Sequence, residues 1–499
     1  MNIEFKREPV DGLVKPATVV FLTPGEEALE SREEISSIKP FLRDHLFSGA
    51  FKGEYLDSLP LYLNGGWLVA VGLGQGARLT EERYIEAAAQ AGQKLKELKV
   101  NQAVVILPPT AKFGQEKTAE LTALGLKLAI TPRNDYKSSS KDREGVSLKT
   151  ITLQMTQSYD SNLSVKAALD RATAMAKAQQ LTRELTERPA NLLTPKVMAN
   201  ICEDFGQKHS FSVTIWDEHK LASEKCGCLL AVGQASHNPP RMVIMEYIGK
   251  SGGSLGAPRA IIGKGVTFDS GGLFLKPADN IAHMKGDMSG AAAVLSLMVG
   301  VTELNLPIHL VAILALAENM PGGAAVKPGD IVVSLSGQTV EITNTDAEGR
   351  LLLADALSLA QRYDPYCLID VATLTGACAV ALGENCAGVF SNHDYLRNDV
   401  IKAGREVGED FWPLPLYEPY AELLKSDLAD LKNWAARSGG AIHAALFLKK
   451  FVKDELPWVH IDIAGTARKG KSSPSCPEGP TGFGARTLLK LLSNSASGQ

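Results

Sequence analysis

The first third of the chain alternates short apolar runs with segments of helical periodicity. Apolar runs at 17–23, 67–74 and 101–108 predict strands. Residues 80–99 and 116–128 predict helices, because their apolar positions recur every three or four residues. Polar residues 137–144 predict a solvated loop. Strands that alternate with helices are typical of an α/β unit with a largely parallel sheet.

A long helical pattern follows from Val165 to Arg188, and Pro189 ends it. Beyond it, apolar runs of strand type continue toward the C-terminus. The pattern therefore predicts an α/β protein of two α/β domains joined by a long helix. We expect a smaller N-terminal domain at 1–163, a linker helix at 164–189, and a larger domain at 190–499 with a central sheet flanked by helices.

In the larger domain, four strand-like runs end abruptly in polar residues and a turn. These are 259–263, 309–317, 340–343 and 367–372, and 458–465 is a further buried-strand pattern. In open α/β sheets, binding sites gather at the carboxyl ends of the strands. We therefore expect one site to draw on all four endings.

Carboxylates are concentrated after these strand-like runs. Asp346, Glu348 and Arg350 alternate with small residues, so an extended stretch would place all three on one side. Asp269 and Asp287 lie in short loops upstream. Two carboxylates forced together repel unless a cation lies between them, and such oxygen ligands favour hard divalent ions. Taken singly, each carboxylate could equally be a helix cap or part of a surface ion pair.

Two lysines, Lys264 and Lys276, flank Asp269 among glycines. A lysine beside a dication can lose its proton and act as a neutral ligand or as a poised acid. Both could equally be ordinary solvated lysines. The residues alone predict a two-metal hydrolase and do not separate a peptidase from a phosphatase.

Composition narrows the cellular setting. The 499 residues are 45% hydrophobic and 22% charged, as in globular proteins, and carry a formal net charge of −4. That balance does not favour nucleic acid or an anionic membrane as the main partner. The N-terminus shows no signal-type apolar stretch, and the seven scattered cysteines indicate reduced thiols. We therefore expect a cytoplasmic protein.

Several motifs together resemble those of the leucyl aminopeptidase (cytosol aminopeptidase) family. They are NTDAEGRL at 344–351, KGVTFDSGGLFLKP at 264–277, MKGDMSGAAAV at 284–294, ENMPGGAAVKPGD at 318–330, DVATLTGA at 370–377 and WVHIDIAG at 458–465. They cover nearly the whole larger domain in the family's order. The N-terminal domain is matched more by its layout than by motifs.

The resemblance implies a metalloaminopeptidase that releases leucine and other apolar residues from peptide N-termini. By motif position, two metal ions (zinc, with manganese or magnesium able to replace one) would be held by Lys264, Asp269, Asp287, Asp346 and Glu348. Lys276 would offset oxyanion charge, and Arg350 would hold a bicarbonate that accepts a proton. The substrate would contact Met284, Asn344, Thr373, Leu374 and Gly376. The family also implies a homo-hexamer.

One position departs from the family pattern, and two other functions stay open. Ser289 stands where the family usually has glycine, beside the predicted ligand Asp287. We expect the serine to be tolerated, with an effect on metal preference or pocket shape left open. A regulatory protein that binds nucleic acid and retains a relic site is one alternative. A two-metal phosphoesterase is another, although only Lys276 and Arg350 offer cations for a phosphate.

Overall fold

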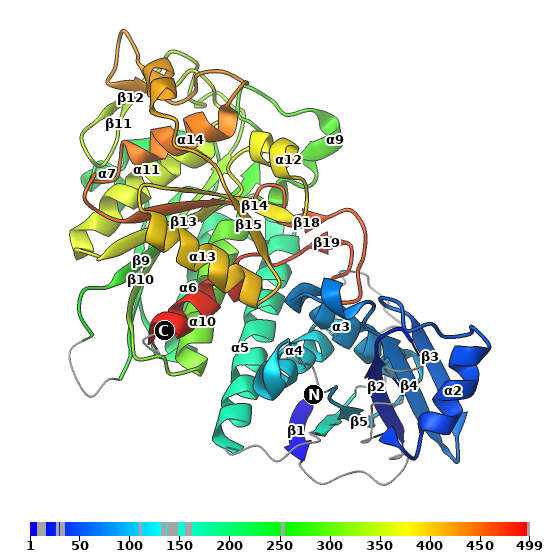
Figure 1. Cartoon of the computed structure of the whole chain (residues 1–499). Helices are drawn as coiled ribbons and strands as arrows, with labels where there is room; N and C mark the ends of the chain where they lie inside the picture. Colours follow the sequence, from blue (N-terminus) through cyan, green and yellow to red (C-terminus); the bar gives the residue numbers. More distant parts are fainter. Residues whose placement is uncertain are drawn as a thin grey trace. The chain divides into compact units, whose positions relative to one another are not determined.

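The computed structural model describes residues 1–6, 16–25, 29, 35–108, 112–130, 136, 148–154, 162–250 and 255–496 (Figure 1). The loop predicted at 137–144 lies outside them. Contacts divide the chain into two compact units, one of residues 1–176 and 471–478, the other of residues 177–470 and 479–499. The domain boundaries at 163/164 and 189/190 stay a prediction.

The first unit contains the α/β sheet that its apolar runs predict. Its six strands lie in the order β1 (Asn2–Lys6), β6 (Thr150–Gln154), β5 (Gln102–Ile106), β2 (Ala17–Leu22), β4 (Gly66–Gly72) and β3 (Ser58–Leu63). Neighbouring strands run parallel except β4 and β3. The predicted helices are α3 (Glu81–Glu97) and α4 (Gly114–Ala129), which pack on each other, and α2 (Lys39–Phe47) precedes them.

A buried glutamate holds the distant segment 471–478 within the first unit. Glu86 on α3 is 8% exposed. It accepts hydrogen bonds from Ser473 Oγ at 3.0 Å, Ser475 N at 3.0 Å and Ser475 Oγ at 2.5 Å. Because more than 380 residues separate these partners, no periodic pattern in the sequence could have predicted the contact.

The second unit is built on an eight-stranded mixed sheet. Its strand order is β15 (Asp410–Pro413), β14 (Cys386–Ser391), β17 (Trp458–Asp462), β13 (Cys367–Ala372), β9 (Arg259–Asp269), β10 (His309–Asn319), β8 (Arg241–Ile248) and β7 (Ser212–Trp216). The four central strands β17, β13, β9 and β10 are parallel. Their carboxyl ends therefore meet at one edge of the sheet, as expected for a site that draws on several strands.

Helices cover the two faces of this sheet. α10 (Ser289–Glu303) packs on β9, β10 and β13, while α11 (Glu348–Ala360) packs on β9 and β10 together with α8 (Gly227–Gly233). Glycine permits the close approach on each side. A Cβ at Gly290 of α10 would lie 2.1 Å from the carbonyl oxygen of Val371, and one at Gly349 of α11 would lie 2.7 Å from Lys264 Nζ. Both helices can therefore approach the site closely.

The long predicted helix is α5 (Asn162–Glu187), and the contact-based division falls inside it. The remaining elements of the second unit are α6 (Pro195–His209), α7 (Glu218–Ser223), α9 (Ala278–Ile281), α12 (Gly376–Leu382), α13 (Asp394–Glu406), α14 (Gly440–Lys449), α15 (Ala485–Ala496), β11 (Ile331–Val333), β12 (Thr339–Glu341), β16 (Leu431–Lys432), β18 (Arg468–Lys469) and β19 (Gly479–Pro480). None of the described helices is long and apolar enough to cross a membrane.

The structure corrects one local expectation. The predicted strand at 340–343 is β12, which belongs to a separate three-stranded sheet with β11 and β16. Asp346, Glu348 and Arg350 do not alternate along an extended stretch, because Glu348 and Arg350 lie in the first turn of α11. A glutamate in the first turn of a helix interacts favourably with the helix dipole.

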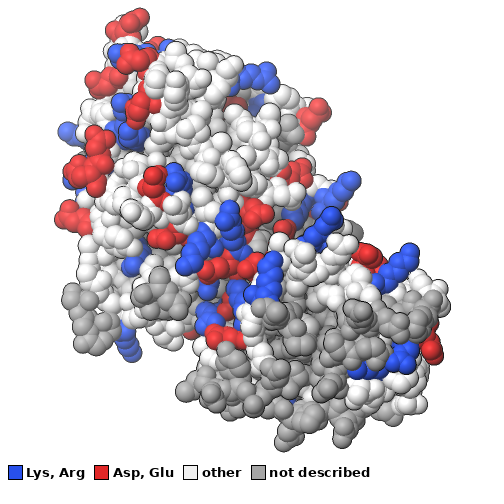
Figure 2. Space-filling view, viewed as in Figure 1, with Lys and Arg blue, Asp and Glu red and all other residues white. Residues whose placement is uncertain are grey.

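Charged side chains of the second unit are mixed in sign. On the face shown in Figure 2, acidic and basic residues are interspersed over its upper part rather than gathered by sign. This distribution agrees with the formal net charge of −4. Such a face does not produce the single-sign field that favours a polyanionic partner.

Candidate metal centre and active site

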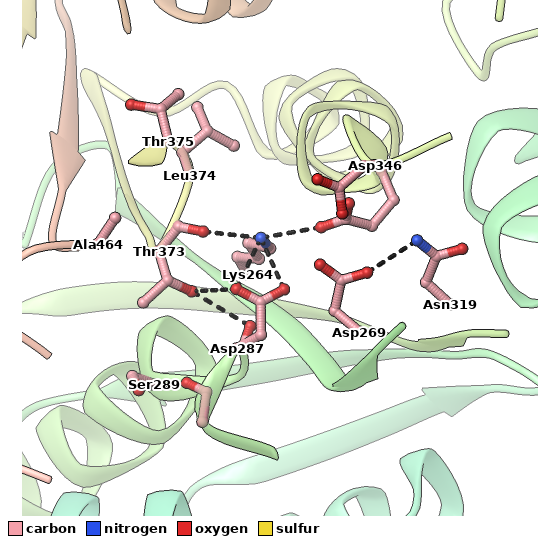
Figure 3. A network of polar contacts seen from close by, with 12 residues as sticks. Lys264, Asp269, Asp287, Ser289, Asn319, Asp346, Thr373, Leu374, Thr375 and Ala464 are labelled. Carbon is pink, nitrogen blue, oxygen red and sulfur yellow. Dashed lines mark hydrogen bonds and ion pairs between the residues drawn. The ribbon is translucent and has the colours of Figure 1, made fainter. Parts of the chain in front are cut away.

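Four carboxylates and two lysines, far apart in the sequence, converge at the carboxyl edge of the central sheet. Figure 3 shows Lys264 with Asp269, Asp287 and Asp346 around it. β9 contributes Lys264 and Asp269, the loop after it contributes Lys276, and the short helix Met284–Gly286 leads into Asp287. Asp346 lies in the turn before α11, and Glu348 is the first residue of that helix. The structure thus brings together all five residues predicted to be metal ligands.

Lys264 lies at the centre of this cluster and is 2% exposed. Its Nζ donates to Asp287 Oδ1 at 2.9 Å and to the carbonyl oxygen of Thr373 at 2.7 Å, and it lies 3.0 Å from Glu348 Oε1. Burial alone would lower the pKa of Lys264, but Asp287, Glu348 and Asp269 outweigh it and raise that pKa. Lys264 is therefore an ammonium whose three N–H donors all point at oxygen.

Lys276 forms the second cation of the cluster. Its Nζ lies 2.7 Å from Asp269 Oδ2 and 2.6 Å from Asp346 Oδ1, and its side chain is 18% exposed. Burial would lower its pKa, but Asp269, Glu348 and Asp346 raise it. Lys276 is thus a permanent positive charge at the more open side of the cluster, where Asp346 is the most exposed carboxylate.

The cluster has the chemistry of a site for divalent cations. Oxygens of Asp269, Asp346 and Glu348 lie within 4.8 Å of one another. Four carboxylates face two ammonium groups, so the ionised cluster carries excess negative charge in a buried environment. Glu348 Oε2 is also buried and has no hydrogen-bond partner among the described residues. Since buried polar atoms are normally paired, these residues fit a bound cation.

The same crowding shifts the carboxyl pKa values. Burial and the neighbouring Glu348 raise the pKa of Asp269 to about 6, although both lysines oppose the shift. Burial also raises the pKa values of Asp287 and Asp346. Burial would raise the pKa of Glu348 too, but Lys264 and Lys276 lower it. A cation bound at the cluster would therefore compete with protons for these three carboxyls as the pH falls.

Arg350, in the first turn of α11, lies behind the carboxylates and is 5% exposed. Its Nη1 donates to the carbonyl oxygen of Asn433 at 2.8 Å, while its Nε is buried and has no partner among the described residues. Burial lowers the pKa of Arg350 to about 10, so the side chain is still a cation at neutral pH. An unpaired, charged N–H donor of this kind fits a small anion.

The residues predicted to contact the substrate surround this cluster on several elements. Thr373 and Leu374 form the turn after β13, and Gly376 is exposed at the start of α12. Thr373 Oγ1 donates to Asp287 Oδ1 at 2.7 Å. Met284 is half-buried just before Asp287. Asn344 differs, because its side-chain oxygen is already occupied in accepting the backbone N–H of Asp346 at 2.8 Å.

Ser289, the departure from the family pattern, directs its hydroxyl into the protein. It is 3% exposed and donates to the carbonyl oxygen of Gly286 at 2.5 Å. The neighbouring Gly290, not position 289, is where a Cβ would clash with the strand. The fold therefore accommodates the serine, whose hydroxyl links the start of α10 to the turn that carries Asp287.

Two asparagines that the sequence did not single out hold the ligand-bearing loops. Asn319, at the end of β10, donates to Asp269 Oδ1 at 2.8 Å and to the carbonyl oxygen of Thr345 at 3.0 Å. The Asn433 side chain accepts from Thr343 N at 2.9 Å and donates to the carbonyl oxygen of Asn344 at 2.7 Å. Asn319 does follow one of the four strand-like runs and lies in the motif at 318–330, and these positions were its sequence signals.

Replacement of Asn319 by alanine should weaken metal binding. The amide fixes the orientation of Asp269, and loss of such an outer-shell partner typically costs about 10- to 100-fold in metal affinity. Titration of the chelator-treated variant with Zn²⁺ or Mn²⁺, followed by calorimetry, measures this change. Affinity equal to that of the unchanged protein would show that Asp269 needs no orienting partner.

Comparisons with known proteins agree with this geometry. Residues 180–489 match the model of the cytosol aminopeptidase family, catalytic domain, and residues 19–140 match that of its N-terminal domain. A probable cytosol aminopeptidase of Desulfovibrio desulfuricans is 43% identical over 427 residues, covering 85% of each chain. One of Roseiflexus castenholzii is 40% identical over 465 residues, covering 92% of this chain and 94% of the relative.

Solved structures show the same similarity over nearly the whole length. A mutant of tomato leucine aminopeptidase has a TM-score of 0.89 and 30% identity, covering 99% of this chain and 96% of its own. The bottromycin maturation enzyme BotP in complex with Mn has a TM-score of 0.85 and 31% identity, covering 97% of this chain and all of its own. The chain thus belongs to the cytosol aminopeptidase family, metal-dependent hydrolases that remove residues from the N-termini of peptides.

Proposed function

We propose that the cluster around Lys264 is a two-metal aminopeptidase centre. One ion would be held by Asp269, Asp346 and Glu348, and the other by Lys264, Asp269, Asp287 and Glu348, so that Asp269 and Glu348 bridge the pair. The observation that carries the proposal is the convergence of three carboxylate oxygens within 4.8 Å in a cluster with excess negative charge.

The identity of the ions follows from the donor set. Carboxylate oxygens with one lysine nitrogen suit zinc, and oxygen-rich sites also suit manganese and magnesium. The manganese in the similar BotP structure supports manganese as a working metal. Lys264 can become a ligand only after it loses its proton and one of its present hydrogen bonds, because an ammonium has no free lone pair.

The protein groups around the centre have distinct roles in the proposed reaction. Two bound ions would supply an activated water and polarise the scissile carbonyl. Lys276, the more exposed of the two lysines, would place its ammonium beside the carbonyl oxygen and offset the charge that develops there. Arg350 would hold bicarbonate as the proton acceptor, because no carboxylate of the cluster is left free for that role.

The substrate would lie between the ligand cluster and the turn that follows β13. Thr373, Leu374 and Gly376 would contact it from that turn, and Asn344 would contribute from the loop before α11. Met284 would shape the pocket for the first side chain, since a flexible thioether adapts to varied apolar groups. We therefore expect leucine and other apolar residues to be favoured at the substrate N-terminus.

A free substrate amine should be required for cleavage, and this requirement tests the proposed function. The α-amine would occupy a ligand position near Asp287 and fix the scissile carbonyl beside Lys276. Acetylation removes the basic lone pair and adds bulk there, and a misplacement of about 1 Å can cost 10²-fold in rate. Leu-Gly should thus be cleaved at least about 10²-fold faster than acetyl-Leu-Gly at equal concentration, as measured by chromatography of the products.

The control for this comparison is a peptide that keeps the amine but alters the bond. Leu-Pro should be a poor substrate, because proline distorts the bond to be cut, while it should still compete with Leu-Gly for binding. Equal cleavage of Leu-Gly and acetyl-Leu-Gly would contradict amine anchoring. It would instead indicate a peptidase that does not need a free N-terminus.

The setting proposed for the enzyme follows from its relatives. Their description as cytosol aminopeptidases supports a cytoplasmic location, and the family resemblance supports a homo-hexamer that acts on peptides. Light scattering on the purified protein tests the hexamer. The mixed charge on the part of the second unit seen in Figure 2 gives a nucleic-acid-binding role no support as the main function.

A further inference from the structure

Another buried carboxylate, that of Asp462, lies outside the ligand cluster and against the turn that follows β13. Asp462 ends strand β17 and is 1% exposed. Its Oδ1 accepts hydrogen bonds from Leu374 N at 3.1 Å and Ala464 N at 3.1 Å, and more weakly from Thr375 N at 3.5 Å. Its Oδ2 accepts from Thr375 Oγ1 at 2.7 Å. Two of the three residues that donate to it thus belong to one turn.

The burial of the Asp462 carboxylate is not explained by a salt bridge. Among the described residues, no lysine, arginine or histidine forms a salt bridge with it. Arg350 and His460 act on Asp462 only through space, without a hydrogen bond, so the hydrogen bonds that Asp462 accepts must offset its lost hydration. Hydrogen bonds to an ionised acceptor are about twice as strong as neutral ones. A charged group at this position therefore holds the turn more firmly than a neutral one would.

The turn from Thr373 to Thr375 is anchored on two sides. On the side of the ligand cluster, the Thr373 carbonyl accepts from Lys264 and the Thr373 hydroxyl donates to Asp287. On the other side, Leu374 and Thr375 donate to Asp462. Figure 3 shows Thr373 pointing toward Lys264 and Asp287, with Leu374 and Thr375 further from them. Without Asp462, the turn would lose its side-chain hydrogen bonds on the side away from the cluster.

Thr375 links Asp462 to the next helix through two hydrogen bonds. Its hydroxyl donates to Asp462 and accepts the N–H of Cys378 at 3.1 Å, which caps the N-terminus of α12. β13 and β17 are parallel neighbours with Ala372 opposite Asp462, so the turns that follow them leave the sheet at the same edge. Asp462 therefore joins the turn after β13, the start of α12 and the turn after its own strand.

We propose that Asp462 is a positioning residue of the aminopeptidase reaction, which fixes the turn Thr373–Thr375 at the distance from the ligand cluster that substrate binding requires. The inference rests on the proposed function, in which Thr373 and Leu374 contact the substrate. Asp462 itself acts only through that turn. Its loss should therefore raise KM more than it lowers kcat, and it should leave the bound metal in place.

The test replaces Asp462 by asparagine, which has the same shape but no charge. Asp462→Asn should lower kcat/KM for Leu-Gly by about 10-fold, mostly through KM, because a displaced turn weakens substrate positioning. Elemental analysis should find the same metal content as in the unchanged enzyme. Loss of metal in step with activity would overturn the proposal, because Asp462 would then act through the metal site.

Asp355 provides a matched control for the replacement of a buried carboxyl group that accepts backbone N–H groups. It is 0% exposed on α11, and it accepts the N–H groups of Leu229 and Leu335, both at 2.8 Å. Asp355→Asn should lower the melting temperature as Asp462→Asn does, but it should keep kcat/KM within about twofold. An equal loss of kcat/KM in both variants would overturn the proposal, because any buried carboxylate would then have the same effect.

Variants of Thr375 test the same contact from the other side and do not depend on the folding of Asp462→Asn. Thr375→Ala should raise KM as Asp462→Asn does, and Thr375→Ser, which keeps the hydroxyl, should restore it. The double variant should lose less than the sum of the two single effects, because both remove one interaction. Variants Asp462→Asn and Thr375→Ala that both match the unchanged enzyme would overturn the proposal. An unchanged, metal-loaded enzyme that does not cleave Leu-Gly would instead contradict the proposed function.

Discussion

Removal of divalent metal should abolish peptide hydrolysis, and zinc, manganese or cobalt should restore it. Asp269, Asp346 and Glu348 bring their oxygens within 4.8 Å of one another, and Glu348 Oε2 has no protein partner among the described residues. A metal ion bound there would both activate a water and polarise a carbonyl, which no described side chain of the cluster can do. Dialysis against a chelator, elemental analysis, and assay of Leu-Gly cleavage before and after each metal is added measure the effect.

The pH dependence of metal binding gives this prediction a second readout. Asp269 has a pKa raised to about 6, chiefly by burial, so it gains a proton as the pH falls through that value. A metal ion competes with that proton, and therefore affinity should decrease below about pH 6 and increase above it. Full turnover by enzyme that elemental analysis shows to be metal-free would exclude the two-metal mechanism.

Replacement of Lys276 by alanine should lower kcat by about 10²- to 10³-fold, as loss of one oxyanion donor does. The ammonium of Lys276 lies at the open side of the cluster, within 2.7 Å of Asp269 and 2.6 Å of Asp346. Its removal leaves those two carboxylates without this positive counter-ion, so the metal content should not fall. Steady-state kinetics with Leu-Gly and elemental analysis of the same sample test both statements.

Lys490 supplies the matched control for Lys276. Its side chain is 15% exposed, compared with 18% for Lys276, and it pairs with Glu406 at 3.3 Å on elements outside the cluster. Lys490→Ala should therefore leave kcat unchanged. Loss of metal in Lys276→Ala would instead make Lys276 part of the metal site and contradict its assignment to the transition state.

The elements with strong periodicity agree closely with the sequence-based expectation. The apolar runs at 17–23, 309–317 and 367–372 are β2, β10 and β13, and the long pattern from 165 to 188 is α5. The short run at 340–343 was the exception, because a run of four residues with two apolar ones does not specify which sheet a strand joins. Glu348 and Arg350 were expected on an extended stretch but lie in α11, since helix ends depend on caps and contacts more than on periodicity.

For the candidate site, too, the sequence predicted some features and not others. Motifs and local composition by themselves indicated the family, the predicted carboxylate ligands Asp269, Asp287, Asp346 and Glu348, and the lysines beside them, because these residues lie next to strong strand and helix signals. The structure is what brings these residues together, and it adds that Lys264 contacts oxygens of Asp287, Thr373 and Glu348, on three separate elements. The order of the strands, which places β9, β10 and β13 side by side, was equally invisible in the sequence.

Only the tertiary structure identified the side chains that hold the ligand-bearing loops in place. Asn319 lies 50 residues from Asp269, Asn433 lies 89 from Asn344, and Asp462 lies 88 from Leu374. A hydrogen bond between such distant positions leaves no periodic pattern, because either partner can occur on any buried strand end. The sequence by itself therefore predicted which residues would bind metal, whereas the packing of the sheet decided which neutral and acidic side chains hold them.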